Sequence, residues 1–302
     1  MKTRKWFFIL LIGFMILGGP STSGQDLMDI LEEEIPETTS MVAATFKGTR
    51  IGTGHSVETR KRGVLEFLIS HRFGRTNGGF YELFGLDESN IRFALEYAAT
   101  DRLTVAVGRS SFDKSYDGYI KYRLLQQSSG AQSFPISMTI LGSLAAKTLK
   151  DYLPEDKPSL GDRMAYTAQA LIARKINENL SLQISPTYIH RKELFAPGDP
   201  KHIFALGMGG RMKITSQVAI NAEYYHNFNP IPSISPTNAL TLGIDIETGG
   251  HVFQLLLTNA ITMIEKSFIT ETRDEFFKGD IHLGFNISRA FHLAKKERRS
   301  QW

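Results

Sequence analysis

The chain of 302 residues has no cysteine. It can therefore form no disulfide and supplies no thiol for chemistry or for the lipid anchor of an exported lipoprotein. Long apolar runs are scarce as well, since the run Trp6 to Leu17 is too short to span a bilayer comfortably. With a mean hydropathy of −0.16, these absences exclude a helical membrane protein. They do not exclude a membrane-spanning β-barrel, whose alternating strands leave average hydropathy low.

The chain also lacks a large net charge. Its formal charge is +4, and three of the basic residues are Lys2, Arg4 and Lys5 at the start of the chain. Without them 32 Lys and Arg stand against 31 Asp and Glu, a net charge of +1. We therefore expect no nucleic-acid partner.

Residues 1–24 have the layout of a secretory signal peptide. The basic residues precede the apolar run, and the small and turn-forming residues Gly18 to Gly24 follow it. We expect cleavage near Gln25, with an uncleaved anchor as the alternative.

From residue 63 to about 291, apolar and polar residues alternate in segments of about ten. Ile91, Phe93, Leu95 and Tyr97, for example, alternate with polar or small residues. This period of two predicts strands whose two faces meet different environments. We expect about twelve strands, at residues 63–74, 90–99, 102–111, 116–127, 133–145, 162–174, 180–192, 202–214, 218–228, 238–247, 250–259 and 277–291.

Two features favour a membrane barrel over a soluble β-sandwich, which would also alternate. Short connections, such as 100–101, 176–179, 215–217 and 248–249, alternate with long ones around 75–89, 146–161, 193–201, 229–237 and 260–276. Outer-membrane barrels have this pattern of short periplasmic turns and long extracellular loops, although 112–115 and 128–132 are intermediate. Charged and small residues also occupy one strand face, which suits a hydrated lumen. The sequence predicts an all-β protein, a transmembrane antiparallel up-and-down β-barrel.

Strand parity places the remaining segments. A strand at 41–47 would make thirteen and leave the end of the chain outside, so we place residues 25–62 in the periplasm or in the lumen as a plug. Residues 292–302 are expected to be a basic periplasmic tail. The last strand ends near Phe291, with Phe285 and Ile287 before it. This is roughly the terminal aromatic pattern that the barrel-assembly machinery recognises. The chain departs from the usual pattern because residues 292–302 follow the strand.

Several stretches resemble a family of Bacteroidota outer-membrane β-barrel proteins catalogued only as a domain of unknown function. The resemblance covers roughly residues 40–127 and rests on Phe46–Arg50, Gly54–Glu58, Ser70–Gly74, Tyr81–Asp87, Asn90–Arg92, Thr100–Leu103, Gly108–Ser111 and Tyr116–Leu125. It implies a location and a fold. It implies no activity, so no functional residue is carried over from it.

Charged residues on the polar strand face are the best functional lead. The basic members lie mostly on early strands and the acidic ones mostly on late strands. They either pair across the interior or create a field in a pore that selects a small polar solute. The candidate lumen residues are Arg72, Arg92, Glu96, Arg102, Lys121, Arg123, Arg211, Glu223, Asp245, Glu247, Asp280 and His282.

Arg50, His55 and Glu58 are candidate plug residues. His55 and Glu58 could bind a metal or ligand, but a contact between the plug and lumen charges is the expected role. No histidine pair has metal-site spacing, and we expect no metal or other cofactor. The glycine cluster at 207–210 precedes no helix and is not a phosphate loop.

Three functions remain open. The first is a narrow or plugged small-solute channel. The second is a non-conducting barrel that contacts a periplasmic protein partner through residues 25–62 and the basic tail. The third is a lipid-modifying enzyme, for which His226, Asn227 and scattered serines provide no recognisable nucleophile motif. The expected partners are outer-membrane lipid and, during biogenesis, the barrel-assembly machinery.

Overall fold

The structure is a computed structural model that describes residues 38–150, 159–248 and 251–293. The chain divides after Thr38 into two units, and the account below concerns the second, residues 39–302. The predicted signal peptide and most of the predicted basic tail lie outside the described residues.

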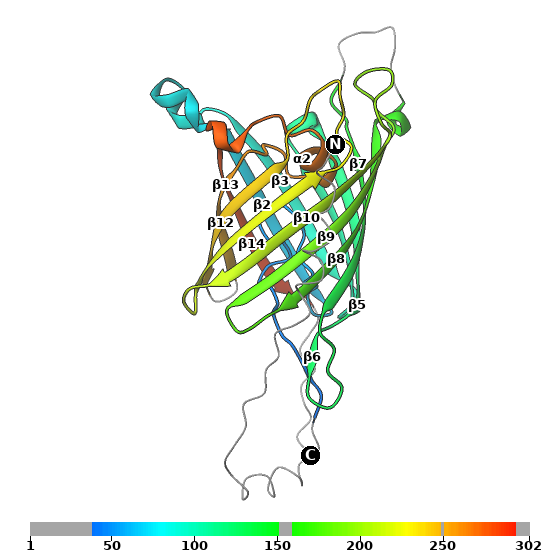
Figure 1. Ribbon diagram of the computed structural model, residues 1–302, viewed down its shortest axis with the longest axis vertical. Coiled ribbons are helices and arrows are strands. Elements are labelled where there is room, and N and C mark those ends of the chain that lie inside the picture. The colour runs from blue at the N-terminus through cyan, green and yellow to red at the C-terminus, as the bar shows by residue number, and fades with distance from the viewer. Residues whose placement is uncertain (1–37, 151–158, 249–250, 294–302) are drawn as a thin grey trace, which may run out of the picture. The chain divides into compact units, whose positions relative to one another are not determined.

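Twelve strands close into one antiparallel barrel (Figure 1). Each strand pairs with the next one along the wall, and the last pairs with the first, so the predicted up-and-down barrel is confirmed. The wall strands are β2 (Val64–Arg75), β3 (Ser89–Ala98), β4 (Leu103–Ser110), β5 (Tyr116–Leu125), β7 (Ser137–Ala146), β8 (Met164–Lys175), β9 (Leu180–Arg191), β10 (His202–Lys213), β11 (Val218–Asn227), β12 (Ala239–Thr248), β13 (His251–Thr258) and β14 (His282–His292).

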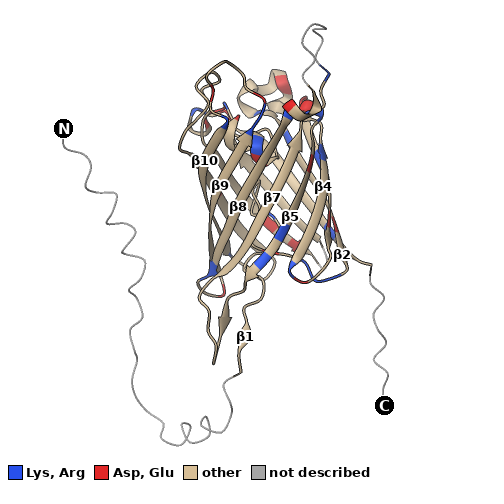
Figure 2. Cartoon of the chain, turned by 90° about the vertical axis from the view of Figure 1, so that its right-hand side faces the viewer, with Lys and Arg blue, Asp and Glu red and all other residues tan. Residues whose placement is uncertain are grey.

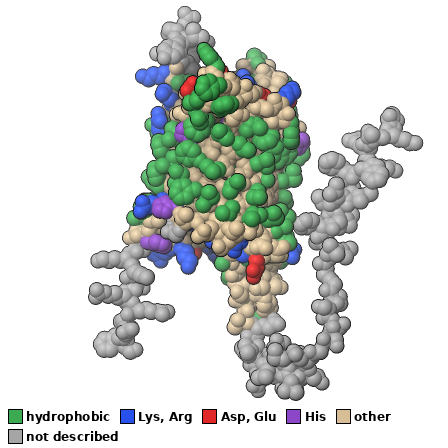
Figure 3. Space-filling model, turned by 90° about the vertical axis from the view of Figure 1, so that its left-hand side faces the viewer, with side chains coloured by type: hydrophobic (Ala, Val, Ile, Leu, Met, Phe, Trp, Pro, Cys, Tyr) green, Lys and Arg blue, Asp and Glu red, His purple; other side chains and the backbone are tan. Residues whose placement is uncertain are grey.

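The alternation in the sequence separates the two faces of the wall. On β13, Phe253, Leu255 and Leu257 are exposed, whereas Gln254 and Leu256 between them are buried. Other strands repeat this pattern, and hydrophobic side chains cover the outer surface in a broad band (Figure 3). An apolar outer face is what a hydrocarbon environment requires.

Successive connections alternate between the two ends of the barrel. The turn end carries the connections 99–102, 176–179 and 214–217. It also carries a small ribbon in which β1 (Ser40–Met41) pairs with β6 (Ser128–Ser129). Among the described residues 38–62, only these two form a strand, and it pairs outside the barrel wall.

The loop end carries the longer connections and most of the helical turns. These are η1 (Thr76–Gly85), η2 (Phe112–Lys114), η3 (Leu160–Arg163), α2 (Glu265–Thr270) and η4 (Phe276–Lys278). Among the described residues, no helix is long and apolar enough to cross a bilayer. All six residues of α2 are buried, so the connection between β13 and β14 folds inward.

The outward face predicts one effect of mutation. Leu255 lies mid-strand on β13 with 55% of its surface exposed. Leu255→Arg should destabilise the protein in a bilayer by about 2–4 kcal/mol, because a charge would face hydrocarbon. Urea unfolding in lipid vesicles measures this change, with Leu255→Met as the control. Equal stability of the two variants would show that this face does not lie in hydrocarbon.

Candidate functional site

Residues 45–59 form a hairpin in the barrel interior, called the plug here. The Ile51 amide donates to the Gly54 carbonyl at 3.0 Å, and the Ser56 amide donates to the Thr49 carbonyl at 3.0 Å. His55 and Ser56 have no solvent exposure. Figure 1 shows this early segment, in blue, running between the walls. Most of the stretch GTRIGTGHSVE, residues 48–58, which carries part of the family resemblance, therefore lies inside the barrel.

Wall side chains supply the hydrogen-bond partners of the plug backbone. A hairpin alone leaves many peptide groups unpaired, and each one buried without a partner costs free energy. Eight strands contribute hydrogen bonds to the plug: β12 through Thr241, whose hydroxyl lies 3.3 Å from that of Thr53, and seven others. Six wall side chains donate to the plug: Arg72 to Thr53 Oγ1 (3.1 Å), Lys121 Nζ to Ser56 O (2.9 Å), Thr139 to Val57 O (2.7 Å), Gln183 to His55 O (2.7 Å), Gln254 to Ile51 O (2.8 Å) and Asn286 to Gly52 O (2.7 Å). The Glu223 carboxylate accepts from the Gly54 amide (3.0 Å).

The glycine at position 54 is required by close approach to the wall. A β-carbon there would overlap the hydroxyl of Tyr225 on β11. The Glu223 carboxylate accepts from the amides of both Thr53 and Gly54, so the hairpin tip is pressed against this strand. Gly209 on β10 makes room in the same way for Ile51 of the plug. The glycine cluster at 207–210 thus has a packing role.

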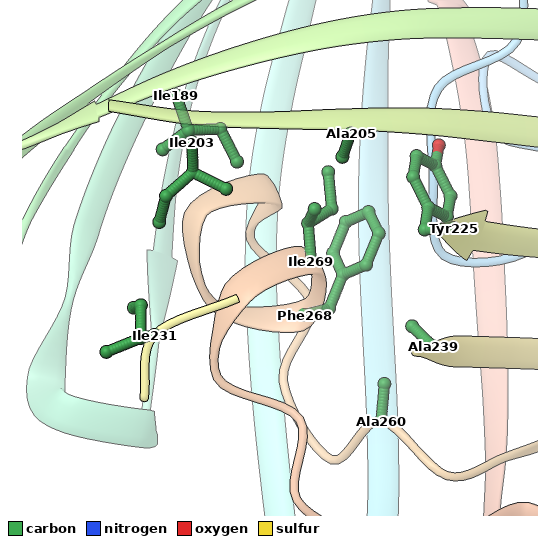
Figure 4. Packing of buried hydrophobic residues seen from close by; sticks show 9 residues of the cluster. All are labelled: Ile189, Ile203, Ala205, Tyr225, Ile231, Ala239, Ala260, Phe268 and Ile269. Carbon is green, nitrogen blue, oxygen red and sulfur yellow. The ribbon is translucent and has the colours of Figure 1, made fainter. Parts of the chain in front are cut away.

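Residues 259–274, between β13 and β14, enter the barrel from the loop end and are called the loop insert here. Its helix α2 places Phe268 and Ile269 in an apolar cluster with inward residues of β9, β10 and β11 (Figure 4). The rings of Tyr225 and Phe268 meet edge to face at 5.0 Å. Within the loop insert, Glu271 pairs with Arg191 of β9 at 2.7 Å and with Lys266 at 3.0 Å.

The plug and the loop insert meet at one buried ionic contact. Glu265 Oε1 lies 3.0 Å from Arg50 Nη1 and 3.1 Å from His55 Nε2. All three side chains are almost completely buried, with 6% of Arg50, 2% of Glu265 and none of His55 exposed. Arg50 and His55 also lie against the ring of Tyr119, at 5.6 and 4.5 Å, and the Tyr119 hydroxyl bonds to Glu96. We call the contact of Glu265 with Arg50 and His55 the junction.

Most of the predicted lumen residues face the interior, where they pair with near neighbours. Arg92 forms a two-pronged pair with Asp117, and Arg211 binds both Asp245 and Glu247. His282 lies 2.6 Å from Asp274 of the loop insert. The predicted pairing of early basic residues with late acidic ones across the interior is wrong for these groups, because the inserts fill the space between opposite walls.

Three predicted residues lie away from the central interior. Arg102 is exposed in a turn at the turn end, and Asp280 lies in the last connection at the loop end, so placing these two in the lumen was wrong. Their charges fall at the ends of the alternating segments, where period-2 parity no longer assigns a face. Arg123 is partly exposed and lies 3.5 Å from Glu58 of the plug.

The acidic and basic residues of the loop insert, together with Asp117 and Arg191, were not among the residues predicted from the sequence. Glu265 has the most central position of these, yet its partners are more than 200 residues away. One local signal was present. The apolar pairs Met263–Ile264 and Phe268–Ile269 lie five residues apart inside a connection that was expected to be solvated.

Above the loop insert lies an open cavity of about 850 Å³, called the vestibule here. Its lining mixes charges of both signs, including Arg75, Asp113, Lys147, Lys266, Arg273 and Asp274. Burial raises the pKa of Asp113 in η2. Asp280 nearby accepts from the Glu275 amide and from Asn77, which lowers the pKa of its carboxyl.

The described residues give little support for metal or nucleophilic chemistry. No group of three or more acidic or histidine side chains in the described ranges is arranged to hold a metal ion. His226 lies 3.3 Å from the side-chain amide of Asn238, and no hydrogen bond in these ranges joins it to a serine.

Comparison with known proteins identifies the family. A model described as "membrane bound beta barrel domain (DUF5777)" matches residues 46–291, which include nearly all of the plug and the whole wall apart from its last residue. The chain belongs to this family. The Bacteroidota lineage expected from the resemblance stays a prediction. No curated protein matches the chain.

Several solved barrels are similar to the chain at low identity. An outer membrane channel from Pseudomonas putida F1 is 15% identical, with a TM-score of 0.47, and the match covers 78% of this chain and 98% of that one. The KdgM porin is 8% identical, with a TM-score of 0.45, over 76% and 99% of the two chains. The CymD monoaromatic hydrocarbon channel is 9% identical, with a TM-score of 0.39, over 77% and 90%.

The junction yields a prediction about stability. Glu265→Ala leaves Arg50 buried without its carboxylate and should lower the free energy of unfolding by about 3–5 kcal/mol. The double variant Arg50→Met, Glu265→Leu should recover most of that loss. Glu275→Ala is the matched control on the same connection, because its partner Lys278 is largely exposed. Equal losses for Glu265→Ala and Glu275→Ala in vesicle unfolding would contradict a buried pair.

A second prediction concerns the position of the plug. Gly54→Ala should force the hairpin tip away from Tyr225 and speed amide hydrogen exchange at residues 50–57. Gly142→Ala on β7 is the control, because a β-carbon there meets no atom within 4 Å. Unchanged exchange in Gly54→Ala would mean that Tyr225 moves instead of the plug.

Proposed function

We propose that this protein is an outer-membrane β-barrel that acts as a narrow small-solute channel, described here in a closed conformation. The supporting observation is the junction, where two separate inserts close the interior by contact with each other. Apart from the continuity of the chain with β2, β13 and β14, side-chain contacts hold both inserts to the wall, so either one could leave without unfolding a strand.

The polarity of the wall supports a water-filled path once an insert has left. Eight-stranded barrels are filled by their own side chains, whereas sixteen strands leave an open channel. Twelve strands lie between these cases and enclose a space that the plug and the loop insert occupy. Lys121, Glu223 and Gln254 bond to the plug backbone, and the same side chains would face water in its absence. Purely apolar filling would serve a permanently closed barrel at least as well.

The proposal includes an orientation. Long loops of bacterial barrels face outward and short turns face the periplasm, so the loop end and its vestibule would meet the external medium. The predicted signal peptide would direct the chain to this membrane through the periplasm. Solutes would then collect in the vestibule, whose mixed charges favour small polar or zwitterionic molecules over apolar ones.

A second candidate is a non-conducting barrel that contacts a periplasmic partner. The observation in its favour is the β1–β6 ribbon, which pairs outside the wall and exposes Met41. In that case the plug would be a permanent filling, and the ribbon and the N-terminal segment would provide the contact surface. A lipid-modifying enzyme is the third possibility and has no assembled catalytic group in its support.

The absence of cysteine allows a decisive conductance test. The hydroxyls of Thr53 in the plug and Thr241 on β12 are 3.3 Å apart, so Thr53→Cys with Thr241→Cys should form the only disulfide in the protein. In planar bilayers with potassium chloride, we expect brief openings of the wild type and a stable open level after deletion of residues 25–62. The oxidised double variant should stay closed and regain openings on reduction.

The single-cysteine variants are the controls for this test. They should behave like the wild type in both redox states. If neither the wild type nor the deletion variant conducts, although both are folded, the channel proposal fails and the non-conducting barrel is favoured.

A further inference from the structure

The outward face of the wall carries an apolar groove of about 590 Å³ across β7, β8, β9 and β10. Small residues make its floor, notably Ala168, Ala170 and Pro186. Larger side chains border it, among them Ile140, Tyr188 and Phe204. Almost no polar atom is exposed in this groove, which lies on strands at the front of Figure 2.

Pro186 explains why the wall is hollowed at this place. The pairing of β8 with β9 is interrupted between Gln169↔Thr187 and Ile172↔Ile184. Pro186 falls within this gap, opposite Ala170, and has no N–H to donate. A proline with two alanines on the neighbouring strand leaves a depression where leucine or phenylalanine covers other parts of the wall.

The groove leads to a polar cluster at its loop-end edge. The Tyr188 hydroxyl, at the border of the groove, lies 2.7 Å from His202 Nδ1. His202 faces His190 in the strand register, and their ring centroids are 4.8 Å apart. Tyr166 continues this row on β8, with its ring stacked on His190 at 6.1 Å.

Two lysines bring positive charge to the same place. Lys192 follows His190 by two residues, Lys201 precedes His202, and both lie within electrostatic range of His190. Both lysines are exposed. The acidic group near Lys192 is Asp162, whose carboxylate accepts from the amide and the hydroxyl of Ser159.

We propose that this groove and its histidine–lysine edge bind a phosphate-bearing membrane lipid. One acyl chain would lie over Ala168, Ala170 and Pro186, and the phosphate would accept hydrogen bonds from the lysines and histidines. The chemistry selects this occupant because an apolar groove on a membrane-facing wall meets acyl chains, and a cationic edge at its end favours an anionic headgroup. Free phosphate would lack the groove contacts, and an uncharged lipid would lack the headgroup contacts.

Native mass spectrometry of the refolded barrel in detergent tests the proposal. The probes are dioleoyl phosphatidic acid, dioleoylglycerol with the same chains but no phosphate, and inorganic phosphate. Wild-type protein should bind phosphatidic acid about thirtyfold more tightly than dioleoylglycerol, since each of the two interfacial lysines contributes about 1 kcal/mol. Inorganic phosphate should not displace the bound lipid.

Two substitutions separate the groove from its charged edge. Ala168→Leu fills the groove and should weaken the binding of both lipids, whereas Ala222→Leu, also outward-facing but on β11, is the matched control. Lys192→Gln with Lys201→Gln should weaken phosphatidic acid alone, with Lys213→Gln at the far end of β10 as its control. Heat-dependent mobility on gels shows that each variant is folded.

Three results would overturn the proposal. Equal binding of the two lipids to the wild type would remove the role of the phosphate. Unchanged binding to folded Ala168→Leu would place the lipid elsewhere, and displacement by inorganic phosphate would point to a simple anion site. None of these results depends on whether the barrel conducts.

Discussion

The interior of a twelve-stranded barrel must be filled with chain or with water, and the architecture follows from this constraint. The wall satisfies most of its own backbone, because every strand has two neighbours. The chain brought inside has no such ladder. Its peptide groups need partners, and long polar side chains on the inner face provide them. The inner face is therefore a set of hydrogen-bonding groups positioned for one particular backbone.

The two inserts meet this constraint in different ways. The plug is narrow and rich in glycine, so its backbone comes close to the wall and is held by Glu223, Gln183 and Asn286. The loop insert has larger side chains and is held by the apolar cluster around Phe268 and Ile269. Charged side chains are buried where the two inserts touch, because each insert supplies the partners that the buried polar groups of the other need. Glu265 pairs with the buried Arg50 guanidinium, and Arg50 together with His55 offsets the free-energy cost of burying the Glu265 carboxylate.

The wall could be predicted from the sequence because its signal is local. Alternation along ten residues assigns each side chain to a face, and connection lengths assign each end, without knowledge of the partner strands. The same logic placed Arg92, Glu96 and Lys121 inside the barrel. It failed for Arg102 and Asp280, which lie beyond the ends of the strands, where alternation no longer assigns a side chain to a face. It also could not find the junction, since Arg50 and Glu265 are brought together only by closure of the whole barrel.

The attachment of the inserts to the wall bears on which one would leave in the proposed channel. Withdrawing the plug exchanges its hydrogen bonds for bonds to water, at about 1 kcal/mol per bond, and exposes the buried side chains of Phe46, Ile51 and Val57. Withdrawing the loop insert exposes Phe268 and Ile269, each worth roughly 1.5–3 kcal/mol of apolar burial. The loop insert is also tied to strands at both of its ends, whereas the wall begins on only one side of the plug. The two costs are therefore of similar size, and in the proposed channel the single attachment of the plug to the wall is what favours its movement toward the turn end. That movement would leave Glu265 facing a hydrated interior, where an unpaired carboxylate is tolerated.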